Sequence, residues 1–343
     1  MSEGPLCSVI LVSYHSQQDL ARCIPSIQSQ HPIEIIVVDN DPNDGTALWL
    51  AQHFPFVRIM SSSNGGYGAA CNQGMAVAKG QYWFVLNPDT ILWPQALDNL
   101  VATAIRNPRS LITAALIQPD GTVNAYGNTM HITGITTCAN IGEPWSNEPA
   151  LRYPLLASGA AMMAHRHVWQ TLNGFDADYF LYMEDADLSL RAQLQGFPVV
   201  CDTRARITHD YTLNLSPNKF YLLERNRWRT MLTTCSTPTL FKLAVPLAAT
   251  ELATWVYALT KGSAYLVAHF KVYFWLFSHH VAWRTKRRLV QGTRVVSDER
   301  LMTLMVTAYP LDQLISSRRM AARLTRLSSA FFSLFIGKGV VMR

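Results

Sequence analysis

A short apolar run that stops at a proline constrains the fold of this chain more than any other stretch. The five residues from Tyr82 to Leu86 are aromatic, aliphatic or β-branched, and Asn87-Pro88-Asp89 follows them directly. The run predicts a buried parallel strand, because neither a helix nor an inner strand tolerates Asn-Pro well. We therefore expect Asp89 just past the end of a strand, where open α/β sheets bind their ligands.

Asn87 and Asp89 are open to two interpretations. Two oxygen ligands in an Asn-x-Asp arrangement could hold a hard divalent cation, which usually accompanies a phosphate substrate. The same residues could form an Asx turn in which Asp89 only caps a helix that begins near Pro94. The local sequence fits both interpretations, so other parts of the chain have to decide.

Strand-like and helix-like segments alternate through the first two thirds of the chain. Strands are predicted over residues 8–12, 34–38, 57–60, 82–86 and 198–201. Helices are predicted over residues 20–27, 47–54, 69–79, 165–172 and 184–194. Ser16 and Asp19 resemble a capping box at the start of the first helix. Alternating elements with polar residues at the strand ends predict an α/β fold with a doubly wound, mainly parallel sheet.

A glycine-rich loop over residues 64–68 precedes one of the predicted helices. It begins like the dinucleotide fingerprint G-x-G-x-x-G, but Cys71 stands at the third glycine and the loop does not follow the first strand. These departures argue against a Rossmann oxidoreductase. Glycines before a helix can still bring backbone N–H groups close to a phosphate. They could also serve only a tight turn.

Three carboxylates, Glu184, Asp185 and Asp187, fall in the first turn of a predicted helix. The helix dipole stabilises each acid there by about 0.3–1 kcal/mol, which accounts for one or two of them. Three carboxylates within four residues repel one another unless a cation or a reacting proton uses them. We therefore expect a catalytic carboxylate rather than a plain helix start. His209 could complete a metal site, although a lone His is more often structural.

Composition and charge narrow the class of protein. The hydrophobic content of 49% over 343 residues suffices for roughly two domains. The six cysteines show no metal-type spacing, and the N-terminus has no signal-peptide pattern, so we expect reduced thiols in the cytosol. Residues 236–343 hold 15 Lys and Arg against 4 Asp and Glu, whereas the whole chain has a net charge of only +6. This charge asymmetry suggests that the C-terminal part faces nucleic acid or an anionic membrane surface. A basic face that only keeps the protein soluble is the alternative.

Two apolar stretches in this part, 240–260 and 263–283, have the length of a membrane span. Glu251 interrupts the first stretch, and His269 and Lys271 interrupt the second. A central charge costs about 2.5–3.5 kcal/mol on insertion, so a span is expected only if Glu251 and Lys271 pair across a hairpin. We favour peripheral attachment through amphipathic helices on anionic lipid. A soluble helical subdomain or a homodimer interface is the alternative.

Seven short motifs, in this order, are similar to those of the family 2 glycosyltransferases with the GT-A fold. They are Val9-Ile-Leu-Val-Ser-Tyr14, Val37-Val-Asp39-Asn40, Asn64-Gly-Gly-Tyr-Gly-Ala-Ala-Cys-Asn72, Leu86-Asn-Pro-Asp89, Ser158-Gly-Ala160, Gly174-Phe-Asp176 and Tyr182-Met-Glu-Asp-Ala-Asp187. The resemblance covers residues 8 to about 235 and is closest to the rhamnosyltransferase-like bacterial branch. It implies a nucleotide-diphospho-sugar transferase fold and a divalent cation, Mg²⁺ or Mn²⁺.

We assign the candidate site residues on this resemblance. Those expected to bind the nucleotide sugar are Ser13, Tyr14, Asp39, Asn64, Gly66, Asn72 and Asn87. Those expected on the acceptor side are Ser158, Gly159 and Asp187. The expected metal ligands are Asp89 and His209, and the expected catalytic residues are the base Asp185 and its neighbour Glu184. Asn87 stands where many members of the family have the first acid of a D-x-D motif.

The sequence thus predicts a GT-A catalytic domain over residues 1–235 and a helical, membrane-associating extension over 236–343. The expected activity is inverting transfer of a sugar, rhamnose as first choice, from a nucleotide-diphosphate donor to a polysaccharide or lipid-linked glycan. The expected location is the cytoplasmic face of the membrane, without a nucleic-acid partner. A catalytically silent scaffold and a sugar nucleotidyltransferase are the alternatives. The prediction requires Asp89 and Asp185 to converge on one cleft.

Overall fold

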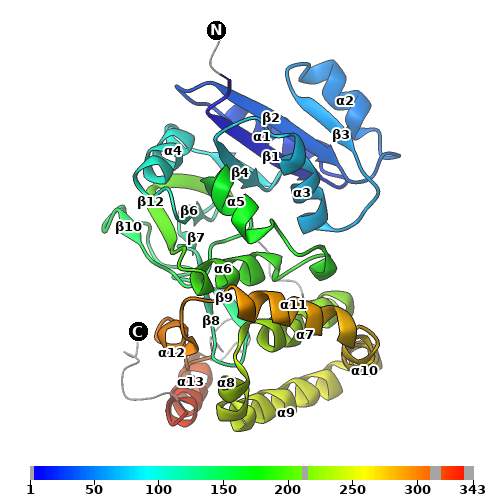
Figure 1. Cartoon of the computed structure of the whole chain (residues 1–343), viewed down its shortest axis with the longest axis vertical. Coiled ribbons are helices and arrows are strands. Elements are labelled where there is room, and N and C mark those ends of the chain that lie inside the picture. Colours follow the sequence, from blue (N-terminus) through cyan, green and yellow to red (C-terminus); the bar gives the residue numbers. More distant parts are fainter. Residues whose placement is uncertain (1–3, 211–214, 310–317, 336–343) are drawn as a thin grey trace. The chain divides into compact units, whose positions relative to one another are not determined.

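The computed structural model describes residues 4–210, 215–309 and 318–335, which form two compact units (Figure 1). Unit 1 comprises Met1–Asn128, Cys138–Ala192 and Phe197–Thr212, and unit 2 comprises Thr129–Thr137, Gln193–Gly196 and Leu213–Arg343. The predicted functional division at residue 235 stays a prediction.

Unit 1 is built around a ten-stranded sheet in the order β10-β12-β6-β11-β4-β1-β2-β3, with β5 paired to β12 and β7 to β6. The strands are β1 (Cys7–Ser13), β2 (Ile33–Asp39), β3 (Arg58–Ser61), β4 (Tyr82–Leu86), β5 (Thr90–Leu92), β6 (Leu111–Ile117), β7 (Val123–Ala125), β10 (Leu151–Arg152), β11 (Ala161–His165) and β12 (Val199–His209). A separate two-stranded sheet pairs β8 (Asn128–Met130) with β9 (Thr136–Cys138).

Helices cover both faces of the large sheet. They are α1 (Gln17–Ser26), α2 (Thr46–His53), α3 (Tyr67–Val77), α4 (Ala96–Arg106), α5 (Arg166–Leu172), the 3₁₀ turn η1 (Ala177–Tyr179) and α6 (Glu184–Leu194). One buried cluster joins the sheet to α1, α2 and α4, and a second joins it to α3, α5 and α6. Alternate residues of β1 enter the two clusters, Val9 and Leu11 the first and Ile10 and Val12 the second. The predicted α/β fold with a doubly wound sheet is confirmed.

The strand register brings several strand ends to one edge of the sheet. The predicted strands β3, β2, β1 and β4 are parallel, and Ser13 pairs with Asp39. Leu86 pairs with Leu11, so residues 87–89 follow at the same edge. The sequence did not predict β11, which runs antiparallel between β4 and β6. Its antiparallel direction brings the residues just before Ala161 to the same edge.

The structure corrects two local predictions. The Ser16 side chain makes no capping bond to the start of α1, and its hydroxyl instead donates to the Tyr14 carbonyl oxygen. Asp89 does not cap the next helix, because β5 intervenes and α4 begins only at Ala96, after Gln95. The Asx-turn interpretation of Asp89 as a helix cap is therefore wrong.

Unit 2 is helical, with α7 packed against α10 and α11, and α10 packed against α9. The helices are α7 (Pro217–Thr234), α8 (Thr237–Lys242), α9 (Ala244–Lys261), α10 (Ser263–Ser278), α11 (His280–Gly292), α12 (Asp298–Met302) and α13 (Arg318–Ser333). Phe220, Ala258 and Ala268 form a buried cluster between α7, α9 and α10. Within the described ranges, none of the helices has both the length and the apolarity that a membrane span requires.

Glu251 connects α9 to its neighbours through a polar network. Its carboxylate accepts hydrogen bonds from Trp228 Nε1 (2.9 Å) and the Tyr273 hydroxyl, and it pairs with His269 Nε2 (2.8 Å) and the Arg227 guanidinium (3.1 Å). The pairing with Lys271 does not form, because residues two apart on a helix face different directions. Burial raises the pKa of Glu251, but the bonds from His269 and Tyr273 and the charge of Arg227 outweigh it and lower the pKa to about 2.

Replacing Glu251 with Gln is expected to lower the free energy of unfolding by about 3 kcal/mol at neutral pH. Removing one charge of a buried pair costs about 3–5 kcal/mol, and Arg227 keeps its bond to Glu224. The stabilisation by ionised Glu251 is present above the unfolded Glu pKa of about 4.3 and is lost as the pH falls toward 2. Denaturant unfolding at several pH values measures both effects. The exposed Glu299→Gln is the control, and an equal loss in both variants contradicts the prediction.

Candidate active site

The ends of β1 and β2 bury polar atoms that have no protein partner. Ser13 and Asp39 are fully buried, and the Asn40 amide donates to the Ser13 carbonyl oxygen at 2.8 Å. Ser13 Oγ, Asp39 Oδ2 and Asn40 Oδ1 are buried without a hydrogen bond. Such orphaned atoms are costly in a folded protein, so they mark a place that a ligand can satisfy. Tyr14, which follows Ser13, is 52% exposed and presents an aromatic side chain to solvent.

The glycine-rich loop is fixed at both of its ends. Asn64 Oδ1 accepts hydrogen bonds from Asn40 Nδ2 (3.1 Å) and from the Gly66 amide (3.2 Å). The Tyr67 amide donates to the Phe180 carbonyl oxygen at 2.8 Å. Gly66 has φ +92°, and a Cβ there would lie 2.2 Å from that same carbonyl oxygen. Only glycine lets this loop approach residue 180 so closely.

Asn72 holds a turn rather than extending toward the strand ends. Its side chain accepts a hydrogen bond from the Phe175 amide (2.9 Å) and donates to the Phe175 carbonyl oxygen (2.8 Å). A Cβ on Gly174 would lie 2.3 Å from Asn72 Oδ1. These two hydrogen bonds to the Phe175 backbone fix the segment before η1. The predicted donor contact of Asn72 stays a prediction.

Asp185 lies in the first turn of α6 and is held by backbone amides. Its Oδ2 accepts a hydrogen bond from the Gly159 amide at 2.9 Å, and Asn128 Nδ2 lies 3.5 Å from the same oxygen. The Tyr67 hydroxyl donates to the Gly159 carbonyl oxygen at 2.9 Å. Tyr67 therefore links the glycine-rich loop to the residue that positions the Asp185 carboxylate. A side chain at Gly159 would crowd Asp185, since a Cβ there would lie 3.0 Å from Asp185 Cβ.

The backbone just before α6 is strained. Phe180, Tyr182 and Met183 have φ values of 62°, 68° and 64°. Non-glycine residues in this region cost about 1–3 kcal/mol each and cluster at functional sites. The sequence carries no signal for this conformation, because none of the three residues favours it.

Burial dominates the electrostatics of the acidic cluster. Burial raises the pKa of Glu184, and the neighbouring charges of Asp185 and Asp187 raise it further. Burial also raises the pKa of Asp185, against the lowering effect of its hydrogen bond from Gly159. Glu184 Oε2 is buried without a hydrogen bond. A carboxylate with a raised pKa is a better proton acceptor than an exposed one.

Asp187 points to the interior of unit 1. Its carboxylate is fully buried and pairs with Arg191 at 2.8 Å. Arg191 also donates to the carbonyl oxygens of Leu172 and Gly174. This arrangement favours a positioning role for Asp187 over the acceptor contact, which stays a prediction. Ser158, also expected on the acceptor side, is 8% exposed, and its amide donates to Thr113 Oγ1 at 3.3 Å.

Asp89 and His209 lie together although 120 positions separate them. β12 pairs with β5 so that His209 stands opposite Thr90, and His209 Nε2 lies 3.5 Å from Asp89 Oδ2. His209 Nδ1 lies 3.2 Å from Asn124 Oδ1. Nδ1 can donate to that oxygen, and Nε2 faces the Asp89 carboxylate, so both ring nitrogens lie beside oxygen atoms.

These donors fit a hard divalent cation with few protein ligands. Asp89 Oδ1 is buried without a hydrogen bond, and Mg²⁺ in particular is bound through one or two carboxylates plus water and substrate phosphate. In the described part of the chain, no cluster of three or more His, Cys, Asp or Glu side chains is arranged around a metal position. The backbone amide of Asn87 donates a hydrogen bond to the Ala160 carbonyl oxygen at 2.9 Å. Ala160 follows Gly159, whose backbone amide donates to the Asp185 carboxylate. The segments carrying Asp89 and Asp185 are therefore both bonded to residues 159–160.

Sequence reasoning did not identify Asn124, Asn128 or Tyr67. The two asparagines lie in a region of weak periodicity. Asn124 reaches His209 because β7 and β12 both pair with β6, and Asn128 reaches Asp185 from the start of β8. Tyr67 belongs to the glycine-rich loop, where an aromatic residue between glycines was the available signal. The convergence of Asp89 and Asp185 on one cleft stays a prediction.

Comparisons with known proteins agree with this fold. A solved structure titled "Crystal structure of GalNAc-T7 with UDP, GalNAc and Mn2+" superposes with a TM-score of 0.55 at 14% identity, over 68% of this chain and 48% of that chain. The fold is the GT-A fold of glycosyltransferases. The model of the family Glycosyl transferase family 2 matches residues 8–167.

Two curated relatives specify the family further. The N-acetylglucosaminyl-diphospho-decaprenol L-rhamnosyltransferase of Mycobacterium tuberculosis (strain H37Rv) is 30% identical over 231 residues, which are 59% of this chain and 75% of that protein. The O-antigen biosynthesis protein RfbC of Myxococcus xanthus is 26% identical over 58% of this chain and 17% of that protein. The chain belongs to glycosyltransferase family 2, and the predicted family is confirmed.

Gly66→Ala is expected to destabilise unit 1 by at least about 1–3 kcal/mol, because the left-handed backbone and the contact with the Phe180 carbonyl oxygen exclude a Cβ. The amide of Tyr67, which bonds to that oxygen, should then exchange with solvent faster. Thermal unfolding and amide hydrogen exchange measure the two effects. Gly65→Ala is the matched control, since its Cβ would meet Ala69 Cβ at 3.3 Å and the Ser63 carbonyl oxygen at 3.9 Å. Similar behaviour of both variants contradicts the prediction.

Proposed function

We propose that this glycosyltransferase transfers a sugar, rhamnose as first choice, from a nucleoside-diphosphate donor to a hydroxyl of a polysaccharide or lipid-linked glycan, with inversion. The observation that carries the proposal is the half-buried Asp185 carboxylate, which accepts a hydrogen bond from the Gly159 amide at 2.9 Å. The similarity to an L-rhamnosyltransferase supports the choice of sugar. The orphaned atoms of Ser13, Asp39 and Asn40 support a nucleotide at the ends of β1 and β2.

Asp185 acts as the general base in this proposal. Its carboxylate takes the proton of the acceptor hydroxyl, and that oxygen bonds to the anomeric carbon of the donor. The bond from this carbon to the diphosphate breaks, and the nucleoside diphosphate leaves with the electron pair. A single displacement inverts the configuration. General base catalysis contributes about 10²–10⁴-fold, and the raised pKa of Asp185 places the base closer to neutral pH.

Asp89 and His209 would hold a Mg²⁺ or Mn²⁺ ion. When bound, the ion supplies positive charge that stabilises the departing diphosphate. The buried, unpartnered Asp89 Oδ1 and the opposed His209 Nε2 support this assignment. The Asn87 side chain is neutral, whereas a second acid at this position would add a negative charge, so weak metal affinity is expected.

A silent scaffold is the second candidate, and Asn87 is the feature that favours it. A protein that only positions partners has no need to bury Glu184 beside Asp185 or to strain the backbone before them. We therefore prefer the enzyme. Donor hydrolysis measured with a panel of sugar nucleotides separates the two candidates. A sugar nucleotidyltransferase would instead form the sugar nucleotide from a nucleoside triphosphate.

Asp185→Asn is expected to lower kcat by at least about 10²-fold, because the amide cannot take the acceptor proton. It should leave the Mn²⁺-dependent affinity for nucleoside diphosphate unchanged, whereas Asp89→Asn should weaken that affinity. Sugar transfer and calorimetric titration with UDP, dTDP and GDP measure the two effects. Asp178→Asn, an exposed acid before the same helix, is the control. Retained turnover in Asp185→Asn would move the base to Glu184 or Asp187.

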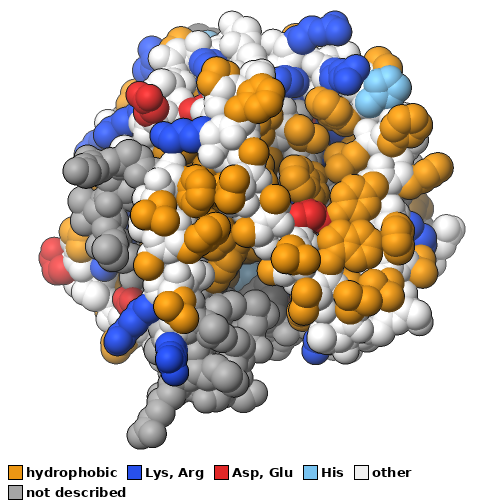
Figure 2. Space-filling model, turned by 90° about the horizontal axis from the view of Figure 1, so that it is seen from below, with side chains coloured by type: hydrophobic (Ala, Val, Ile, Leu, Met, Phe, Trp, Pro, Cys, Tyr) orange, Lys and Arg blue, Asp and Glu red, His pale blue; other side chains and the backbone are white. Residues whose placement is uncertain are grey.

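We further propose that unit 2 attaches the enzyme peripherally to an anionic membrane surface, on the cytoplasmic face. Large apolar side chains on α8–α11 are more than half exposed; they are Phe241, Val245, Leu252, Val256, Leu259, Val267, Phe270, Phe274, Phe277, Val281 and Leu289. We call this set the apolar face. Figure 2 shows hydrophobic side chains gathered across the lower side of the molecule, with Lys and Arg around them. Monomeric soluble proteins rarely expose so many large apolar side chains together.

Charge supports lipid as the partner of the apolar face. Between residues 236 and 297 the only acid is Glu251, and its carboxylate is bound by Arg227 and His269. The same segment carries eight Lys and Arg residues. Apolar side chains beside cations suit the boundary between acyl chains and anionic headgroups. A second copy of this chain would bring two cationic surfaces together.

The full chain is expected to sediment with phosphatidylglycerol vesicles and to be released by salt. Phe270→Ser combined with Phe277→Ser should weaken binding by about tenfold, because two exposed rings no longer enter the bilayer. Phe56→Ser, an equally exposed ring in unit 1, is the control. A chain that ignores these vesicles, or a dimer in solution that the double substitution dissociates, contradicts the proposal.

A further inference from the structure

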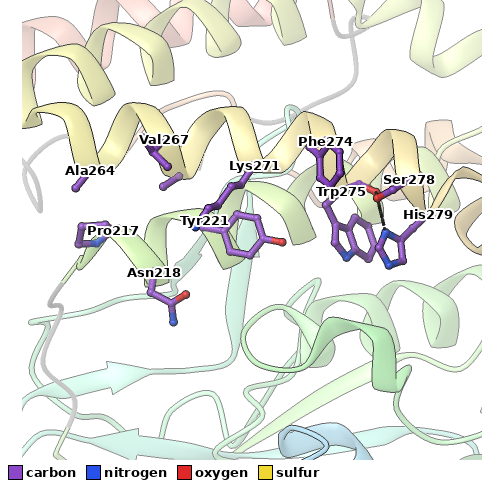
Figure 3. A pocket seen from close by; sticks show the side chains of 11 residues that line it. Pro217, Asn218, Tyr221, Ala264, Val267, Lys271, Phe274, Trp275, Ser278 and His279 are labelled. Atoms are coloured by element: carbon purple, nitrogen blue, oxygen red, sulfur yellow. Dashed lines mark hydrogen bonds between the residues drawn. The ribbon is translucent and has the colours of Figure 1, made fainter.

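A groove between α7 and α10 lies outside the residues assigned to sugar transfer. Its cavity has a volume of about 640 Å³, within the range of about 300–1,000 Å³ that small-molecule sites occupy. Its lining comes from the first two turns of α7 and from most of α10 (Figure 3). All of these residues belong to unit 2.

The groove is cationic. Lys271, on α10, extends toward α7 beside Tyr221 (Figure 3). Lys271 is exposed and has no ion pair with any described residue. The buried guanidinium groups of Arg225 and Arg229 do not line the groove, but lie 4.9 Å and 5.6 Å from the ring centroid of the lining residue Trp275. No Asp or Glu lines the groove. A ligand with negative charge is therefore preferred over a neutral one.

The groove also offers hydrogen-bond donors at its rim. Tyr221 contributes its hydroxyl from α7, and Asn218 contributes a side-chain amide. Ser278 and His279 close the far end, with Ser278 Oγ and His279 Nδ1 2.9 Å apart and the His279 ring stacked on Trp275 at 4.5 Å. Ser278 Oγ also donates to the Trp275 carbonyl oxygen at 3.1 Å, so Tyr221 and Asn218 are the lining groups that can donate to an anion bound by Lys271.

The apolar wall of the groove continues into the apolar face. Val267 is 53% exposed and Phe274 is 74% exposed, and both line the groove as well as belonging to that face. Along α10 the apolar face continues through Phe270 and Phe277. A molecule with a charged head and an apolar tail can thus place the head in the groove and the tail along the face.

We infer that this groove binds the phosphate headgroup of one anionic bilayer lipid, with Lys271 as the ion-pairing residue and the lipid chains along the apolar face. The inference rests on the proposed membrane attachment and adds a defined site to it. A zwitterionic headgroup would bring a second cation toward Lys271, so it binds more weakly. The site makes attachment selective for anionic phospholipid rather than for bilayers in general.

The test uses soluble, short-chain lipids on the full chain below their micelle concentration. Dihexanoyl phosphatidylglycerol should bind saturably in a calorimetric titration, and dihexanoyl phosphatidylcholine should bind more weakly. Lys271→Gln should weaken binding of the phosphatidylglycerol by about fivefold, the upper range for an exposed ion pair. Lys242→Gln is the matched control, since Lys242 is equally exposed and lies outside the groove.

Two further probes identify the source of the phosphate. Inorganic phosphate should compete only weakly, because it lacks the apolar chains. Geranyl phosphate tests for a polyprenyl phosphate instead; if it binds more tightly than the phosphatidylglycerol, the bilayer-lipid assignment is wrong. Equal binding of the two phospholipids, or equal effects of Lys271→Gln and Lys242→Gln, overturns the site.

Failure of this site is distinguishable from failure of the proposed function. Lys271→Gln should still sediment with vesicles through the apolar face and should keep its turnover on a soluble acceptor. If turnover and vesicle binding are normal but Lys271→Gln has no effect on the lipid titration, only the proposed lipid site in the groove is wrong. Lipid binding without any sugar transfer overturns only the enzyme assignment.

Discussion

The parallel register of β1 with β2 and β4 is the constraint on which the candidate site depends. It aligns Ser13 with Asp39 and places residues 87–89 beside them at one edge of the sheet. A slip by one residue would turn every side chain of a strand to the opposite face. Each strand of this set is buried on both faces, so packing fixes the register strongly. The register of the strands, rather than direct contacts between the polar residues, thus brings those residues to the same edge.

A second constraint couples the glycine-rich loop to the acidic cluster. The Phe180 carbonyl oxygen accepts from the Tyr67 amide, and the Tyr67 hydroxyl donates to the Gly159 carbonyl oxygen. Gly159 in turn holds Asp185. The strained residues at 180, 182 and 183 persist because this chain of bonds and the buried Asp187–Arg191 pair fix both ends of the segment. Movement of the donor-side loop would therefore disturb the position of the proposed base.

The sequence predicted features that arise locally and missed those that arise from pairing. Buried β-branched runs with polar ends were enough to predict β1, β2 and β4 and the place of Asp89. The strand β11 escaped notice because its run of Ala and Met carries little β-propensity. The partner of Glu251 was likewise unpredictable, because helical phase, rather than spacing along the chain, turns His269 toward α9 and Lys271 away from it. The positions of Asn124 and Asn128 depend on tertiary contacts alone.

The apolar stretches of unit 2 contain both buried and exposed apolar side chains, which cannot be told apart in a sequence. One side of the α9–α10 hairpin buries Ala258 and Ala268 against α7, whereas the other side exposes Phe270 and Phe277. Apolar packing alone would not choose between these sides, because both are apolar. The Glu251 network makes the choice, since a carboxylate bound by Arg227 and His269 has to stay inside. The polar residue that interrupts the apolar run thus fixes which side of the hairpin is exposed.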